Sequence, residues 1–163
     1  MSINSIEIYT DGSSRGNPGP GGYGVVLKFN GAVKELAKGF RLTTNNRMEL
    51  LAVIEGLRAI KTTQHPIRVF SDSKYVIDAI EKGWLKNWIK TGFKGKKNKD
   101  LWLEYHAIAA NFNISFSWVK GHNGHPENER CDVLAVQAAT GSNLGIDSIF
   151  EATNDALDNT IRF

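Results

Sequence analysis

The chain has 163 residues, of which 41% are hydrophobic and 23% are charged, and its net charge is +3. This composition is typical of one globular domain, and no apolar run reaches the ~18 residues that a membrane-spanning helix requires. The first residues lack the pattern of a signal peptide, and Cys131, the single cysteine, excludes a disulfide within the chain. We therefore expect a monomeric, cytoplasmic protein.

The charge is distributed unevenly along the chain. Residues 141–163 contain four acids and one arginine, a charge of −3, which leaves +6 on residues 1–140. The segment 82–99 contains no acid and seven lysines, at positions 82, 86, 90, 94, 96, 97 and 99. A concentrated basic patch suggests a polyanionic partner. Residues 141–163 are expected to be a C-terminal tail; its apolar residues could pack on the body, but a solvated tail is the simpler interpretation.

The first third of the chain predicts three strands. Residues 3–11 form the first, and a turn rich in glycine and proline follows it. Residues 22–29 and 32–42 form an antiparallel pair, because Asn30-Gly31 between them favours a type I′ turn. Residues 19–24 match G-x-G-x-x-G, but the segment continues as a strand where a dinucleotide-binding fingerprint needs a helix. The pattern therefore excludes a dinucleotide site.

The rest of the chain predicts alternating helices and strands. A basic loop and a short helix are expected over residues 84–99. The other helices are expected over about 46–60, 73–80, 100–110 and 127–139, and the strands over 67–70 and 113–119. Strands separated by helices tend to lie parallel through right-handed crossovers. We predict an α/β fold: a mixed five-stranded sheet, with a three-strand antiparallel meander plus two parallel strands and helices on both faces.

Four acidic residues, at positions 11, 49, 72 and 132, could serve either in catalysis or in local structure. Asp11 ends the first strand, and aspartate also starts turns and caps its own backbone. Asp72 stands where a helix N-cap belongs. Glu49 is the third residue after Asn46, as in a capping box. Asp132 lies inside the last helix, where an exposed aspartate would cost only a few tenths of a kcal/mol.

The four acids would form a functional site if the fold brings their carboxylates together. The strands before Asp11 and Asp72 would bring both carboxylates to one edge of the sheet if they are parallel neighbours. Two unit charges ~4 Å apart repel by about 4 kcal/mol at an effective dielectric constant near 20. A cluster of carboxylates is therefore stable only if it takes up protons or binds cations, and oxygen ligands select Mg²⁺ or Mn²⁺. Two such ions ~4 Å apart catalyse phosphoryl transfer.

A zinc site is a possible alternative near the last helix. His122, His125 and Cys131 are potential ligands. A structural zinc site normally has four ligands at regular spacing, and no matching pair occurs in the sequence. We therefore interpret Cys131 as a small buried hydrophobic residue.

Four motifs, in this order, resemble ribonuclease H of type 1, the bacterial kind, and the resemblance covers about residues 5–140. The motifs are YTDGSSRGNPGPGGYG from Tyr9, TNNRMEL from Thr44, SDSKYV from Ser71 and VKGHNGHPENERCDVLA from Val119. The resemblance implies the ribonuclease H-like fold and a catalytic domain over residues 1–140. It also implies hydrolysis of the RNA strand of an RNA–DNA hybrid, leaving 5′-phosphate and 3′-hydroxyl ends.

The same resemblance implies the roles of the site residues. Asp11, Glu49, Asp72 and Asp132 would hold two Mg²⁺ ions, with Mn²⁺ as an alternative. His122 would be an auxiliary catalytic residue, since histidine titrates near neutral pH and can shuttle a proton or help the product leave. A loop histidine without a task is the alternative.

The basic segment is one expected contact surface for the hybrid. On a helix, the lysines at 82, 86 and 90 and the tryptophans at 84 and 88 would point to nearly opposite sides, so a solvated lysine face over a buried aromatic face is the structural alternative. The resemblance implies a basic protrusion that grips the DNA strand, here a few residues shorter than the common form. The candidate contacts are Trp84, Lys86, Lys90, Lys96, Lys97 and Lys99.

A second expected surface consists of short polar side chains beside tight turns: Asn17, Thr44, Asn45 and Asn46. Such side chains can bond to phosphate, to base edges and to the 2′-hydroxyl that distinguishes RNA from DNA. Capping and turn formation are the alternative explanation. Lys74 is also a candidate contact, although a glutamine that contacts the minor groove is frequent at its position in the family.

Two other functions compete with hydrolysis of the hybrid. They are those of a junction resolvase and of a non-catalytic hybrid-binding module.

Overall fold

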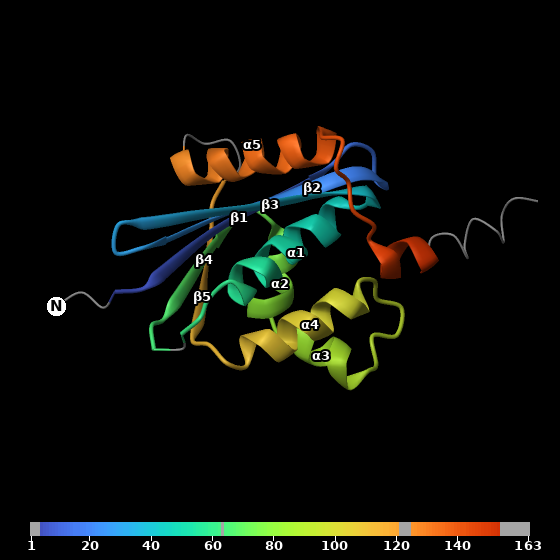
Figure 1. Ribbon diagram of the computed structural model, residues 1–163. Helices are drawn as coiled ribbons and strands as arrows, with labels where there is room; N and C mark the ends of the chain where they lie inside the picture. The colour runs from blue at the N-terminus through green and yellow to red at the C-terminus, as the bar shows by residue number, and fades with distance from the viewer. Residues whose placement is uncertain (1–3, 63, 121–124, 154–163) are drawn as a thin grey trace, which may run out of the picture.

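The computed structural model describes residues 4–62, 64–120 and 125–153 (Figure 1). Its elements, in chain order, are β1 (Ile6–Ser14), β2 (Gly19–Phe29), β3 (Ala32–Thr43), α1 (Asn45–Arg58), β4 (Ile67–Ser71), α2 (Lys74–Glu81), α3 (Trp84–Lys90), α4 (Lys99–Ala109), β5 (Ile114–Trp118) and α5 (Pro126–Thr140). Proline occupies the first turn of α5, where its missing N–H has no helical partner to lose.

The five strands form one mixed sheet in the order β3-β2-β1-β4-β5. β1, β2 and β3 are antiparallel neighbours, whereas β4 is parallel to β1 and β5 is parallel to β4. Figure 1 shows α5 on one face of the sheet and α1 to α4 on the other. The predicted α/β fold is therefore confirmed, including the meander, the two parallel strands and the helices on both faces.

The first strand is longer than the sequence predicts. β1 continues past Asp11 to Ser14 because its last residues pair with Gly21–Gly24 of β2. The glycine-rich stretch, expected to be a turn, begins β2 at Gly19 instead. Local composition indicates a turn, but pairing between the two chain segments makes both of them strand.

Two glycines of these strands allow helices to approach the sheet closely. A Cβ at Gly12 would lie 2.4 Å from the backbone nitrogen of Glu49 in α1, and a Cβ at Gly24 would lie 2.2 Å from the carbonyl oxygen of Cys131 in α5. Any larger residue would push the helix away. These glycines therefore bring the acidic residues of both helices next to β1.

The main core lies between α1 and the sheet. Ile8, Val25 and Val69 of three neighbouring strands are fully buried against Val53 and Leu57 of α1. This packing holds the first turn of α1 in a fixed position relative to β1 and β4, whose carboxyl ends form one edge of the site.

The described part of the C-terminal segment packs on the body. Gly145 forms a parallel bridge with Phe40 of β3, and its N–H donates to Gly39 O at 2.8 Å. Residues 148–153 are helical. Of the two alternatives for this segment, packing is therefore correct as far as residue 153. Within the ranges that the structure describes, no helix has both the length and the apolar character needed to span a membrane.

Candidate active site

Three carboxylates meet near the carboxyl ends of the parallel strands β1 and β4, which are neighbours in the middle of the sheet. Tyr9 of β1 pairs with Phe70 of β4 in the parallel ladder. Asp11 and Asp72 follow these two residues by two positions each, so they lie at the same level of the two strands. Glu49 reaches them from the start of α1. One oxygen atom from each of the three carboxylates lies within 4.8 Å of the others. The predicted convergence is correct for these three acids.

Hydrogen bonding shows how two of these carboxylates are oriented. The backbone N–H of Gly12 donates to Asp11 Oδ1 at 2.9 Å and to Glu49 Oε1 at 3.1 Å. Asp11 lies inside β1, so it does not start a turn. The second oxygen of Glu49, Oε2, is buried and has no hydrogen-bond partner.

Neither Glu49 nor Asp72 caps the amino end of a helix. Thr44 caps α1 by accepting from Arg47 N at 3.3 Å, so the interpretation of Glu49 as part of a capping box is wrong. Ser73 caps α2 in the same way, which means that Asp72 is not the N-cap. Local structure therefore explains neither acid.

The environment favours protonation of Asp11 and Glu49 unless a cation is bound. Burial raises the pKa of Asp11 to about 7, and the charge of Asp72 adds to this effect. Burial raises the pKa of Glu49 well above its ordinary value, and the charges of Asp11 and Asp72 raise it further. An unpaired buried carboxylate oxygen among hard oxygen donors fits a divalent cation such as Mg²⁺.

Asp132 lies beside the cluster and not within it. It is half-buried on α5, and its charge contributes to the raised pKa of Asp11. Its carboxylate is not part of the group whose oxygens lie within 4.8 Å. His122, the predicted auxiliary residue, lies outside the described residues.

The cysteine next to Asp132 is a structural residue. Cys131 is fully buried, and its thiol donates to the carbonyl oxygen of Tyr9 at 3.2 Å. Burial raises the pKa of this thiol, which opposes the thiolate form that zinc requires. The interpretation as a small buried hydrophobic residue is consistent with this environment.

Comparison with known proteins agrees with this geometry. The family model for RNase H matches residues 3–140. The chain belongs to the ribonuclease H family. It is 53% identical to the ribonuclease H of Desulforamulus reducens over 150 residues, which span 89% of this chain and 94% of that protein. Ribonuclease H of Pseudoalteromonas atlantica is 52% identical over 151 residues, 90% of this chain and 97% of that one.

Solved structures show the same family and fold. LC9-RNase H1, a type 1 RNase H with the type 2 active-site motif, has a TM-score of 0.74 and 33% identity, covering 93% of this chain and 81% of its own. LC11-RNase H1, solved in complex with an RNA/DNA hybrid, has a TM-score of 0.64 and 27% identity, covering 83% of this chain and 96% of its own.

In this member of the ribonuclease H family, the short polar residues also stabilise the fold around the cluster. Asn17 Oδ1 accepts from the backbone N–H of Asn45 at 3.2 Å, and Asn45 Oδ1 accepts from Ser14 N at 2.7 Å. Thr44 is the helix cap, whereas the side chain of Asn46 is exposed. Turn and cap roles are therefore present at three of the four predicted contacts, and they leave these residues on the surface or close to it.

The basic surface combines lysines and tryptophans. Trp84 is 43% exposed, and the ammonium group of Lys82 lies 5.5 Å from the centre of its ring. Lys96 lies in the same way over Trp88, 5.6 Å from the ring centre, and Trp88 packs against the core. The structural alternative, a solvated lysine face over a buried aromatic face, therefore holds for Trp88 but not for Trp84, and Lys82 lies before the start of α3. The other predicted lysines of this surface are all exposed: Lys86, Lys90, Lys97 and Lys99.

Lys74 contacts a residue that sequence reasoning did not select. Its ammonium group lies 4.3 Å from the centre of the Trp118 ring, and the indole N–H of Trp118 donates to the carbonyl oxygen of Asp72 at 3.3 Å. Trp118 is 47% exposed at the end of β5. The sign of this contact in the sequence was that Trp118, an aromatic residue, directly precedes the fourth motif.

A groove of about 730 Å³ is lined by residues of both predicted contact surfaces. Asn17, Thr44 and Asn46 come from the polar surface, and Lys96, Lys97 and Lys99 come from the basic segment. Arg47, which no prediction selected, is 3% exposed and also lines this groove. Its place inside the second motif was the only signal in the sequence.

Proposed function

We propose that this protein is an endonuclease that hydrolyses the RNA strand of RNA–DNA hybrids by two-metal-ion cleavage and leaves 5′-phosphate and 3′-hydroxyl ends. The observation that carries the proposal is the cluster of Asp11, Glu49 and the half-buried Asp72 in a member of the ribonuclease H family. The catalytic domain in this proposal is residues 1–140. The hybrid-bound structure of LC11-RNase H1 supports the choice of substrate.

Asp11, Glu49 and Asp72 would hold the divalent ions, Mg²⁺ or Mn²⁺, and Asp132 would complete the ligand set. Such ions activate the attacking water and stabilise the leaving oxygen when they are bound. The protein orients the ligands in advance, since the Gly12 N–H donates to both Asp11 and Glu49. His122 is proposed to move a proton or assist product departure.

The hybrid would lie across both contact surfaces. The polar group of Asn17, Thr44, Asn45 and Asn46 lies near the acidic cluster, where it can recognise the 2′-hydroxyl of the RNA strand. The lysines of segment 82–99 provide positive charge for the phosphates of the DNA strand, and the exposed ring of Trp84 offers an apolar contact beside them. Lys74 would add a phosphate contact close to Asp72.

An assay of four substrates tests this function. RNA–DNA hybrid, duplex RNA, duplex DNA and a four-way junction are incubated with Mg²⁺ from zero to saturation. We expect cleavage of the RNA strand of the hybrid alone, only with the metal, and none by Asp11→Asn. Preferred cleavage of the junction would support a resolvase instead. Metal-independent hybrid binding without cleavage would support a non-catalytic module.

A further inference from the structure

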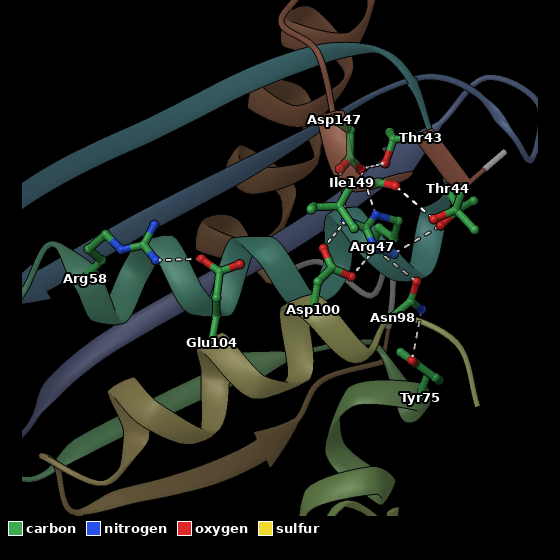
Figure 2. Close-up of polar contacts among 11 residues, drawn as sticks. Thr43, Thr44, Arg47, Arg58, Tyr75, Asn98, Asp100, Glu104, Asp147 and Ile149 are labelled. Carbon is green, nitrogen blue, oxygen red and sulfur yellow. Dashed lines mark hydrogen bonds and ion pairs between the residues drawn. The ribbon is translucent and has the colours of Figure 1, made fainter. Parts of the chain in front are cut away.

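Arg47 joins three parts of the chain that are far apart in the sequence. Its guanidinium donates to Asp147 at 2.7 Å through Nε and at 2.9 Å through Nη2. It also donates to Asp100 at 2.8 Å through Nη1 and at 2.7 Å through Nη2 (Figure 2). The start of α1, the start of α4 and the C-terminal segment therefore meet at one buried side chain.

Asp147 is held by more than the guanidinium. It is 9% exposed, and its Oδ2 also accepts from the hydroxyl of Thr43, the last residue of β3, at 2.8 Å. Phe150 of the same segment has its ring centre 5.6 Å from the guanidinium carbon of Arg47. The carboxylate is thus fully engaged with the body, and its removal would leave a buried cation with half of its partners.

The start of α4 is fixed at the same place. Asn98, the last residue before α4, has a positive φ of 66°. Its side-chain oxygen accepts from Arg47 Nη1 at 3.4 Å, and its amide donates to the hydroxyl of Tyr75 at 3.0 Å (Figure 2). In the sequence, Lys99 stands between Asn98 and Asp100, and Lys96 and Lys97 come directly before Asn98. The lysine-bearing loop is therefore anchored at its carboxyl end through Arg47.

The elements joined by Arg47 are those that carry the two contact surfaces. Thr44 and Asn46 stand at the start of α1, Lys96 and Lys97 belong to the loop before α4, and Lys99 is the first residue of α4. Arg47, Asp100 and Phe150 line the groove between these surfaces. A change in how Arg47 is held would change the spacing of the two walls.

We propose that Asp147 is a positioning residue for nucleic-acid binding, which holds Arg47 between α1 and α4 and so fixes the spacing between the polar surface and the basic loop. The ligand is a double-stranded nucleic acid whose phosphates contact both walls of the groove. The inference rests on the proposed function for the identity of that ligand. The C-terminal segment then belongs to the binding apparatus although it lies outside the matched family region of residues 3–140.

Asp147→Asn tests the inference, with Glu151→Gln as the matched control. Glu151 is a largely buried carboxylate of the same segment, and its two oxygens bind the guanidinium of Arg41 on β3 at 2.8 to 3.2 Å. This pair does not involve α1 or α4. Hybrid binding is measured by fluorescence anisotropy in EDTA at several salt concentrations, and cleavage is measured with Mg²⁺.

For Asp147→Asn we expect the dissociation constant and KM to rise about tenfold, with kcat within about twofold of the wild type. The log–log salt slope should become shallower by about 0.7 to 0.9 for each phosphate that the variant no longer binds. Glu151→Gln should match the wild type in all three quantities. A structural role alone would lower the unfolding midpoint without changing the salt slope.

Two results would overturn the inference: wild-type binding by folded Asp147→Asn, or an equal loss of affinity in Glu151→Gln. If circular dichroism shows that Asp147→Asn is unfolded, Thr43→Val decides, because it removes only the hydroxyl that donates to Asp147. We expect a smaller increase of KM in that variant, and an unchanged KM contradicts the inference. A wild-type protein that binds the hybrid without cutting it would refute the proposed function, while the anisotropy comparison would still test Asp147.

Discussion

Gly12 and Glu49 are in direct contact through the backbone of one and the side chain of the other. The Gly12 N–H donates to Glu49 Oε1 at 3.1 Å, and a Cβ at Gly12 would lie 2.4 Å from Glu49 N. The close approach of α1 to β1 and the orientation of the carboxylate therefore depend on the same residue. No other amino acid allows both.

Gly12→Ala should displace the first turn of α1 and with it the carboxylate of Glu49. We expect cleavage to fall at least about a hundredfold, since a shift of about 1 Å in a catalytic group has effects of this size. Overpacking should also lower the free energy of unfolding by about 1 to 3 kcal/mol. Urea denaturation and single-turnover cleavage measure the two effects.

Gly31→Ala is the matched control for this substitution. Gly31 has a φ of +83° in the β2–β3 turn and no atom within 4 Å of a Cβ built on it. Alanine should cost about 1 kcal/mol of stability there because of the positive φ. Activity per folded molecule should stay at the wild-type level. Equal activity losses in both variants would contradict the role assigned to Gly12.

The acidic cluster should make stability depend on pH in the absence of divalent ions. The pKa of Asp11 rises from 3.8 to about 7 in the folded state because of burial and the charge of Asp72. The folded state therefore binds more protons than the unfolded state between about pH 4 and 7, and stability falls as pH rises through this window.

Asp11→Asn should remove part of this dependence and stabilise the protein at pH 7 and above. We expect a gain of about 1 to 3 kcal/mol, below the limit of about 4 kcal/mol that the full shift would give. Urea denaturation in EDTA at pH 5, 6, 7 and 8 measures the difference, which should grow with pH. A difference that is constant across this range would argue against a raised pKa of Asp11.

Mg²⁺ should stabilise the wild-type protein by binding to the folded state alone. At a hundred times the dissociation constant the gain is about 2.7 kcal/mol. Glu49→Gln should lose most of this gain, because it removes the charge of one proposed ligand. Glu129→Gln, an exposed acid on α5, should keep it. Thermal unfolding with and without Mg²⁺ provides the measurement, and equal Mg²⁺ stabilisation of wild type and Glu49→Gln would exclude Glu49 as a ligand.

Mg²⁺ affinity should also increase as pH rises toward 8. Protons compete with the ion for Asp11 and Glu49, whose pKa values are raised by burial and by the neighbouring carboxylates. Below pH 7 we expect the apparent dissociation constant to fall by up to about tenfold per pH unit for each proton that the ion displaces. Isothermal titration calorimetry should show proton release on binding. A pH-independent constant would contradict the raised pKa values of Asp11 and Glu49 in the metal-free protein.

Hybrid affinity should depend on salt through the basic loop. If about five phosphates are contacted, the log–log slope is roughly −3 to −5, and replacing Lys96 and Lys97 together by alanine should reduce its magnitude by about 1.4 to 1.8. Lys34 and Lys61 are exposed but do not line the groove, so alanine there should leave the slope unchanged. A flat salt response of the wild type would refute the proposed phosphate contacts.

Much of the fold and of the acidic cluster could be predicted from the sequence. The Asn30-Gly31 turn, the apolar spacing of α1 and the motifs around Asp11, Glu49 and Asp72 depend on nearby residues, and local chemistry is enough to interpret them. The parallel alignment of β1 and β4 followed from the helices that separate later strands, because crossovers have a preferred hand. The order of elements and the meeting of three acids were therefore determined by the sequence.

Tertiary contacts decided the rest. β1 extends past Asp11 only because β2 pairs with it, and Glu49 is free of capping only because Thr44 performs that role. Trp84 is exposed because α3 begins at that residue, and Asp147 is held in place because Arg47 of α1 and Thr43 of β3 both donate to it. Such contacts join residues up to about a hundred positions apart in the chain. Local propensity does not report them, because their free energy arises only when the whole fold brings the partners together.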